Sequence, residues 1–191
     1  MRFFTYGPRS LTRAIIDLPF SKLVTFTIDG NGNVYVKGGL VYAIGSRDPE
    51  VAIDANTEEG KKLYVQGGTI IAVGKLESGA SITGGTAKQT TSWTAETWYA
   101  LYNGGELVAA FKTPTQSASS SGGGPGGRPG GSSSQALVVY TSSTPTLTSG
   151  VTVSGGIEYF AGAANIGGTV SGGSSVTLSN YTSSGGPGGR P

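Results

Sequence analysis

The stretches VYVKGGLVYAIG (Val34–Gly45) and LYVQGGTIIAVG (Leu63–Gly74) align without a gap, and VTVSGGIEYFAG (Val151–Gly162) has the same form. Each contains apolar residues two positions apart, a polar residue, a Gly-Gly pair, a second run of β-forming residues, and a closing glycine. The period of two, as at Val34 and Val36, places those side chains on one face of a strand. Such repetition indicates an all-β protein built from similar units.

Two architectures fit a Gly-Gly pair between strands. Each pair could be a hairpin turn, because glycine tolerates positive φ, or a corner between two faces of a parallel β-helix. Gly38 and Gly67, the first glycines of the first two pairs, are 29 residues apart in the sequence. Hairpin arrays have turns about every 8–12 residues, whereas one coil of a solenoid needs roughly 20–30. The spacing therefore predicts a right-handed, single-stranded parallel β-helix, with an irregular β region at its C-terminal end.

The composition narrows the classes of function. The chain has 191 residues with 34 glycines, no cysteine and no histidine, which excludes disulfides, zinc fingers and histidine-based triads. The formal net charge of +2 is too small for a nucleic-acid footprint. No run approaches the roughly 20 apolar residues that cross a bilayer, so no membrane span is expected. No Walker loop, dinucleotide fingerprint or nucleophile elbow is present.

Low-complexity segments set the expected domain limits. Residues 117–134 (SASSSGGGPGGRPGGSSS) and the end of the chain share the heptapeptide GGPGGRP, whose composition cannot form a core. We expect a β-helix domain over 23–181 with 117–134 as a flexible loop. Residues 1–22 are expected to form an N-terminal cap or non-matching segment, and 182–191 a flexible tail.

The segment GGLVYAIGSRDPEVAIDANTEEGKKLYVQGGTIIAVG (Gly38–Gly74) resembles secreted bacterial carbohydrate-binding domain-containing proteins, which repeat GG-x-V-x-A-x-G around an acidic turn. LYNGGELVAAFKTP (Leu101–Pro114) and ALVVYTSSTPTLTSGVTVSGG (Ala136–Gly156) are similar to that family's C-terminal part. The resemblance implies a polysaccharide-lyase-like β-helix, an extracellular or cell-surface location, and binding of acidic plant polysaccharide. The family's Asp-Asp-Ala-Ile coils are missing, so we expect a C-terminal portion of a longer protein.

The richest polar cluster is SRDPEVAIDANTEEG (Ser46–Gly60), which holds five of the eleven carboxylates. Calcium prefers six to eight oxygen ligands from carboxylates, carbonyls and amides. The predicted ligands are Asp48, Glu50, Asp54 and Asn56. In the alternative, Asp54 and Asn56 bond nearby backbone N–H groups of a turn and the glutamates are solvated.

A second candidate site is the aromatic group in SWTAETWYALYN (residues 92–103). Sugars stack their C–H faces on flat rings, so the predicted carbohydrate-binding residues are Trp93, Trp98, Tyr99 and Tyr102, with Arg47 for a uronate carboxylate. Strand parity puts Trp98 and Tyr102 on one side and Tyr99 on the other, and one of these sides must be core. Packing of the rings is the competing interpretation.

These observations predict a non-catalytic extracellular carbohydrate-binding module for an acidic or plant-type polysaccharide, assisted by calcium. No catalytic residue is predicted, since no carboxylate pair or lyase motif stands out and a fold does not carry function. The alternative is a structural or adhesive surface module without glycan specificity. A polysaccharide-lyase-like enzyme ranks last, and the sequence does not specify the oligomeric state.

Overall fold

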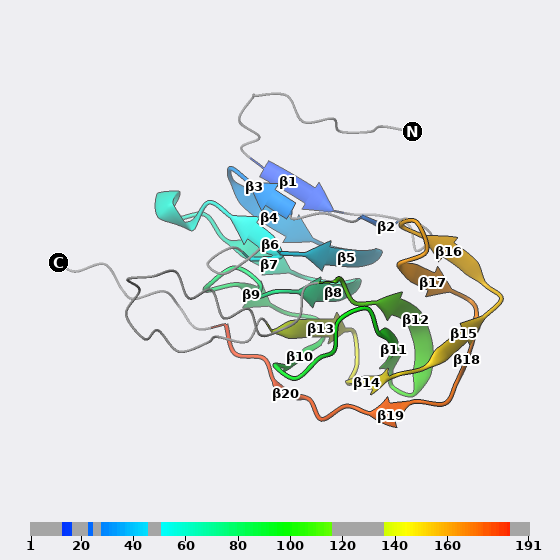
Figure 1. Cartoon of the computed structure of the whole chain (residues 1–191). Coiled ribbons are helices and arrows are strands. Elements are labelled where there is room, and N and C mark those ends of the chain that lie inside the picture. Colours follow the sequence, from blue (N-terminus) through cyan, green and yellow to red (C-terminus); the bar gives the residue numbers. More distant parts are fainter. Residues whose placement is uncertain (1–12, 17–22, 25–27, 46–50, 116–135, 184–191) are drawn as a thin grey trace, which may run out of the picture.

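The computed structural model describes residues 13–16, 23–24, 28–45, 51–115 and 136–183, and these residues form an all-β protein (Figure 1). Their regular structure consists of β-strands and one short 3-10 helix, η1 (Thr57–Glu59). The Gly/Ser/Pro-rich loop predicted at 117–134 and most of the predicted tail lie outside the described residues. Among the described residues, no helix has the length and apolarity to cross a membrane.

The N-terminal half is built from parallel strands. One sheet has the order β1-β4-β7-β9, and β3 pairs in parallel with β6 as a separate two-stranded sheet. The Cα partner of Val34 is Leu63, so the first two Gly-Gly units lie side by side with the 29-residue offset of their sequences. The strands are β1 (Arg13–Ile16), β3 (Ile28–Gly30), β4 (Asn33–Val36), β6 (Ile53–Ala55), β7 (Leu63–Val65) and β9 (Ser81–Ile82).

The central sheet is mixed and has the order β2-β5-β8-β13-β10-β20. Strand β5 pairs in parallel with β8, but β13 pairs antiparallel with β8 and β10 pairs antiparallel with β13. The runs LVYAI, TIIAV and LVVYT of β5, β8 and β13 are almost wholly buried, as expected for strands covered on both faces. The strands are β2 (Leu23–Val24), β5 (Leu40–Ile44), β8 (Thr69–Val73), β10 (Thr86–Thr90), β13 (Leu137–Thr141) and β20 (Ser179–Asn180).

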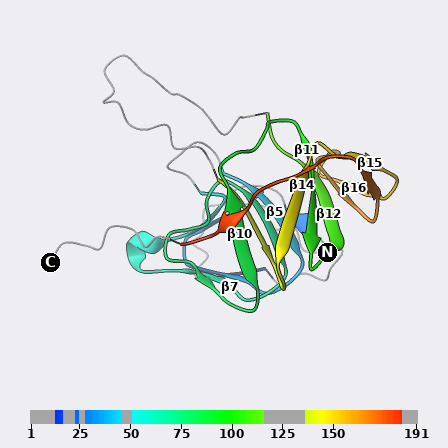
Figure 2. The same cartoon turned by 90° about the horizontal axis from the view of Figure 1, so that it is seen from below.

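The third layer is antiparallel, with the order β16-β17-β12-β11-β14-β19, and β15 pairs antiparallel with β18. Seen from below, β11, β12 and β14 lie beside the central strands, and β15 and β16 lie at the side opposite η1 (Figure 2). The strands are β11 (Trp98–Asn103), β12 (Glu106–Lys112), β14 (Pro145–Ser149), β15 (Thr152–Ser154), β16 (Ile157–Tyr159), β17 (Ala164–Ile166), β18 (Thr169–Ser171) and β19 (Ser174–Ser175).

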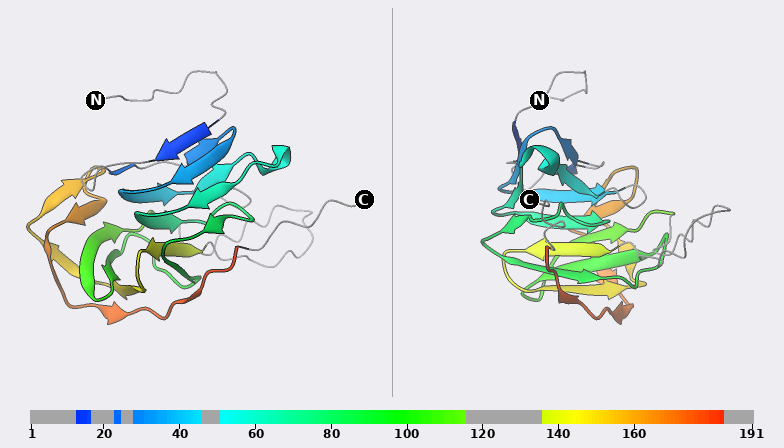
Figure 3. Two further views of the ribbon diagram at one scale, coloured as in Figure 1. Left: turned by 180° about the vertical axis from the view of Figure 1, so that it is seen from behind. Right: turned by 90° about the vertical axis from the view of Figure 1, so that its left-hand side faces the viewer.

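The predicted parallel β-helix is therefore wrong. The chain forms several separate sheets, and all pairs of the third layer are antiparallel (Figure 3). The glycine conformations give a physical reason. In the first two units only the second glycine of the pair, Gly39 or Gly68, has positive φ (77° and 81°), whereas in the third unit both Gly155 and Gly156 do (66° and 76°). The same Gly-Gly pair thus forms a different bend in the third unit. There, β15 pairs antiparallel with β18, and β16 pairs antiparallel with β17.

Two hydrophobic clusters pack against opposite faces of the central sheet. One contains Val34, Val36, Leu63 and Val65 from the parallel sheet, and the other contains Trp93, Tyr99, Leu101 and Phe111 from the antiparallel layer. Tyr42 of β5 joins the central and antiparallel layers: its ring centroid lies 5.7 Å from that of Phe111. Its hydroxyl donates a 2.6 Å hydrogen bond to the Lys112 carbonyl.

Burial raises the pKa of Tyr42 above its ordinary value of about 10. The folded state therefore favours the neutral phenol, so this contribution to stability is complete below pH 10 and is lost as pH rises beyond it. We expect the free energy of unfolding to fall above pH 10 by about 1.4 kcal/mol per pH unit from Tyr42 alone. Urea unfolding of the wild type and of Tyr42→Phe over alkaline pH measures this: the variant should show the smaller slope, and equal slopes would contradict the expectation.

Candidate functional site

The predicted aromatic residues divide between core and surface. Trp93 and Tyr99 are 7% and 2% exposed and belong to the cluster beneath the antiparallel layer. The Tyr99 ring stacks on Phe111 with centroids 5.6 Å apart, and its hydroxyl accepts a hydrogen bond from Thr94 N (2.9 Å). Trp98 and Tyr102 are half-buried, whereas Tyr99 and Leu101 are buried. The packing interpretation thus describes Trp93 and Tyr99, while Trp98 and Tyr102 retain exposed surface.

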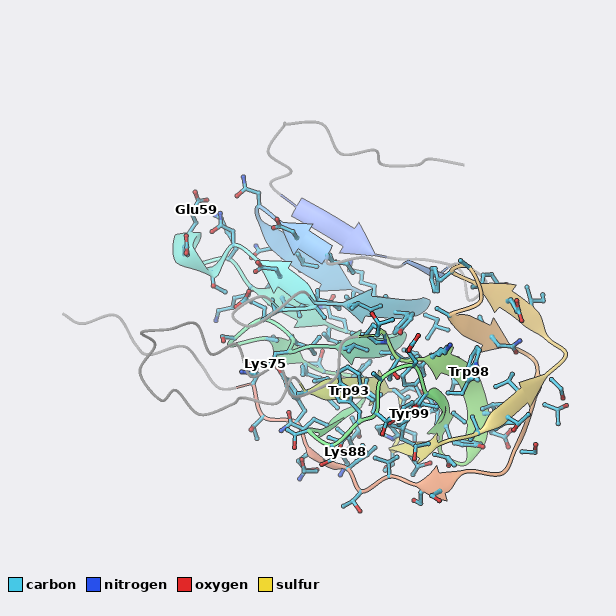
Figure 4. All side chains as sticks on the ribbon, in the orientation of Figure 1. Glu59, Lys75, Lys88, Trp93, Trp98 and Tyr99 are labelled. Atoms are coloured by element: carbon cyan, nitrogen blue, oxygen red, sulfur yellow. The ribbon has the colours of Figure 1, made fainter. Side chains whose placement is uncertain are left out.

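The predicted calcium turn is only partly described, because Arg47, Asp48 and Glu50 lie outside the described residues. Asp54 is half-buried in the middle of β6. Asn56 caps η1, with Oδ1 accepting from Glu59 N (3.2 Å), as the turn-capping alternative expects for this residue. In Figure 4, Glu59 of η1 lies far from Trp98, so these two residues do not belong to one site.

A hollow of about 450 Å³ opens where β3 and β6 end, and we call it the acidic hollow. Asp29 and Asp54 are Cα partners in the parallel pair β3–β6, which places both side chains on the same face. Asn56 Nδ2 donates to Asn31 Oδ1 at 2.7 Å across the same two turns. The lining residues are Asp29, Gly30, Asn31, Asp54, Ala55, Asn56, Thr57, Glu58 and Glu77.

Glu77 closes the floor of the acidic hollow and is 8% exposed. Its carboxylate accepts hydrogen bonds from Ser78 N (2.7 Å), Ala55 N (3.4 Å) and Thr57 Oγ1 (3.4 Å). A buried carboxylate is tolerated when such donors replace its hydration. Glu77 therefore ties the β6 turn to the segment after β8, which is a structural role.

The donor set of the hollow does not make a ready calcium site. Both ends of the Asn56 amide are already hydrogen-bonded, which leaves at most one lone pair of its Oδ1 atom for an ion. Within the described part of the chain, no group of three or more Asp or Glu side chains is placed to hold a metal. Calcium assistance stays a prediction.

A different aromatic pair lies on the outward face of the parallel sheet. Tyr35 of β4 and Tyr64 of β7 are Cα partners, and their rings are stacked with centroids 4.8 Å apart and planes inclined by 9°. Both tyrosines are half-buried, while their strand neighbours Val34 and Leu63 point into the core. On the far side of Tyr64, its Cα partner in β9 is the small residue Ser81, so no bulky side chain of β9 covers the adjoining position of that row.

Polar and cationic residues border this pair, and the six residues together are here named the tyrosine platform. Lys37 and Gln66 follow β4 and β7, Lys62 precedes β7, and all three are exposed. The Oδ1 atom of Asn33 accepts a hydrogen bond from Lys62 N at 2.8 Å, which fixes one corner of the border. The platform consists of Asn33, Tyr35, Lys37, Lys62, Tyr64 and Gln66.

Sequence reasoning singled out Asp54 and Asn56 but missed the other segments of the acidic hollow, and it missed the tyrosine platform, although each place has a signal. Ile28-Asp29-Gly30-Asn31 and Ile53-Asp54-Ala55-Asn56 repeat the pattern I-D-x-N, which marks the two paired turns of the acidic hollow. The tyrosines occupy the same position of the two aligned Gly-Gly units, between apolar residues that face inward. Comparison of the residues between the apolar positions would have revealed the stacked pair.

Comparison of the chain with protein-family models, with curated protein sequences and with solved structures finds no match. The sequence resemblance to carbohydrate-binding proteins is therefore an expectation, and the function has to be argued from the residues.

Proposed function

We propose that the protein is a non-catalytic carbohydrate-binding module for acidic polysaccharide and that the tyrosine platform is its binding surface. The observation that carries the proposal is the stacked, outward-facing pair Tyr35–Tyr64. Aromatic rings at a surface provide apolar faces for the C–H groups of a sugar, and their hydroxyls add hydrogen bonds. The pair has the register of two adjacent strands, so the platform is held by the sheet and not by a loop.

The border of the platform suits a negatively charged glycan. Lys37 and Lys62 lie on either side of the tyrosine row, at opposite ends of β4 and β7, and both are exposed. An ammonium group gains a charge-assisted hydrogen bond from a carboxylate, and at a solvated surface such a pair gives selectivity more than affinity. Uronate-containing polymers, in which a pyranose ring carries a carboxylate, combine both kinds of recognition.

Replacement of Tyr64 by alanine is expected to weaken binding of polygalacturonate about tenfold, because an aromatic stacking contact is worth about 0.5–1.5 kcal/mol. Affinity electrophoresis through gels containing the polymer, followed by calorimetric titration, measures the change. Tyr102→Ala is the matched control, since it removes a half-buried tyrosine from β11. Lys37→Gln with Lys62→Gln should remove the preference for polygalacturonate over a neutral glucan.

The same gels separate the alternatives. Loss of binding in Trp98→Ala and not in Tyr64→Ala would move the site to the aromatic group of β11 and overturn the platform. Retardation by no polysaccharide would support the structural or adhesive module instead. Repeating the titration with a chelator tests the calcium prediction, because a calcium-assisted module should then lose affinity.

A further inference from the structure

The stacking of Tyr35 on Tyr64 determines which surfaces the tyrosine platform offers to a ligand. The ring centroids lie 4.8 Å apart and the ring planes differ by 9°. Neighbouring strands of a sheet are about 4.8 Å apart, so the two rings stand upright on the sheet and face each other along its hydrogen-bonding direction. Each ring therefore has one face covered by the other ring, and the solvent above the pair meets ring edges.

The other face of Tyr64 has only a small residue beside it. The sheet order β1-β4-β7-β9 places β9 on the side of Tyr64 away from Tyr35, at the edge of this sheet (Figure 1). The Cα partner of Tyr64 in β9 is Ser81, whereas that of Tyr35 in β1 is Ile15. The Ser81 side chain ends one atom beyond Cβ, so it is too short to cover a ring face one strand away.

The hydroxyl of Ser81 is not used within the fold. Ser81 is half-exposed, and within the described part of the chain its Oγ atom makes no hydrogen bond. Its neighbour Ile82 packs against the core, so strand alternation turns Ser81 outward, to the same face of the sheet as Tyr64. A serine hydroxyl both donates and accepts. The outer face of Tyr64 and Ser81 together provide the apolar surface and the hydrogen-bonding group that a sugar ring needs.

A sugar ring centred over Ser81 would continue the stacked row by one strand. It would lie about 4.8 Å from the Tyr64 ring, because that is the spacing of the strands. A pyranose chair is thicker than an aromatic ring, so its axial C–H groups contact the tyrosine face at this separation. Lys62 precedes Tyr64 by two residues and is exposed, and its ammonium group complements a carboxylate on the sugar.

We propose that the sugar subsite of the tyrosine platform is the space over Ser81, where one uronate-bearing pyranose stacks on the β9-side face of Tyr64. The Ser81 hydroxyl hydrogen-bonds a hydroxyl of this sugar, and Lys62 pairs with its carboxylate. Tyr35 is a positioning residue, because its ring supports the opposite face of Tyr64. The inference rests on the proposed function and assigns binding to one ring face, not to the row of ring edges.

Ser81→Ile tests the subsite by filling it, because isoleucine suits a strand and covers the Tyr64 face without presenting a flat ring. In affinity electrophoresis and calorimetric titration of the full chain, we expect binding of polygalacturonate to weaken about tenfold, as in Tyr64→Ala. Ser81→Ala removes only the hydroxyl, so about a threefold loss is expected. Thr152→Ile is the matched control: it adds the same side chain at an exposed position of β15 and should leave binding unchanged.

A double variant shows whether Ser81→Ile acts by covering Tyr64. In a Tyr64→Ala background, Ser81→Ile should cause no further loss of affinity, because the face that it covers is already absent. A second full loss in the double variant would contradict the subsite.

Proton NMR titration of the wild type needs no substitution at position 81. The ring signals of Tyr64 should shift more than those of Tyr35, with the two rings assigned from Tyr35→Phe and Tyr64→Phe. Equal shifts of both rings would place the sugar across the ring edges and overturn the proposal.

Failure of the subsite and failure of the proposed function give different results. If Ser81→Ile binds polygalacturonate like the wild type while Tyr64→Ala is weakened, the subsite is wrong and the tyrosine platform stands. If the wild type is not retarded by the polymer at all, both are wrong.

Discussion

Replacement of Gly85 by alanine is expected to lower the free energy of unfolding by about 3 kcal/mol, the upper part of the range for overpacking. A Cβ at this position would overlap the Thr141 carbonyl oxygen and lie 2.8 Å from both Cζ and the hydroxyl of Tyr140. The neighbouring residue Thr86 is the Cα partner of Thr141 in the β10–β13 pair, so the clash is with a paired backbone. Relief requires the two strands to separate.

The Tyr140 ring cannot move away from Gly85 without losing a hydrogen bond. Its hydroxyl donates a 2.8 Å hydrogen bond to the Thr83 carbonyl, and the residue is fully buried. Displacement would leave a buried polar group unpaired, which by itself costs about 1–3 kcal/mol. The melting temperature should fall by about 6–12 °C, measured by circular dichroism.

Gly79→Ala is the control for this prediction, because a Cβ there meets no atom within 4 Å and only the positive φ of 73° opposes it. That strain costs about 1 kcal/mol. If Gly85→Ala were no more harmful than Gly79→Ala, the close approach of β13 to Gly85 would be incorrect.

The parallel pairing of the first two Gly-Gly units could be predicted from the sequence, whereas the fold of the whole chain could not. Spacing alone gave the 29-residue offset, because both units bury the same alternate residues, and the register Val34–Leu63 agrees with it. The amino-acid sequence of β13 does not indicate whether the strand pairs in parallel or antiparallel. Its run LVVYT is buried on both faces and fits a parallel or an antiparallel neighbour equally well, so its antiparallel pairing with β8 depends on tertiary packing.

In the candidate site too, local features could be predicted from the sequence, whereas contacts between distant segments could not. Strand parity separated Tyr99 from Trp98 and Tyr102, because alternation is a local property of β11, but it did not say which side is the core. The acidic hollow combines Asp29, Asp54 and Glu77 from three separate segments, and composition drew attention only to the segment with the most carboxylates. The stacked tyrosines could not be found from composition, because each is the one tyrosine of its short strand. They come together only when β4 pairs with β7.

Replacement of Gly156 by alanine is expected to cost about 3 kcal/mol in the free energy of unfolding, as the sum of backbone strain and overpacking. Gly156 has φ of 76°, and a Cβ there would overlap Asn165 Oδ1 and the Gly168 nitrogen and lie 2.7 Å from Gly168 Cα. Two Gly-Gly pairs thus face each other across the hairpin that joins β15–β16 to β17–β18. Gly155→Ala is the matched control: its φ of 66° carries the same strain, but a Cβ there meets nothing within 4 Å, so a loss of only about 1 kcal/mol is expected.

Asn165 explains why the facing glycines are needed. Its side chain is 4% exposed, and its Nδ2 donates to the Gly155 carbonyl at 2.8 Å. The Oδ1 atom makes no hydrogen bond within the described residues and lies where a Cβ of Gly156 or Gly168 would stand. A Cα–H group of each glycine points toward this oxygen, in the direction that a Cβ would otherwise take, and can act as a weak donor to it. In an Asn165→Ala background, Gly156→Ala should therefore cost less by about 1 kcal/mol, while the cost of Gly155→Ala should stay the same. Urea unfolding of the four chains of each cycle measures both coupling energies, and equal coupling at Gly155 and Gly156 would show that backbone strain alone demands these glycines.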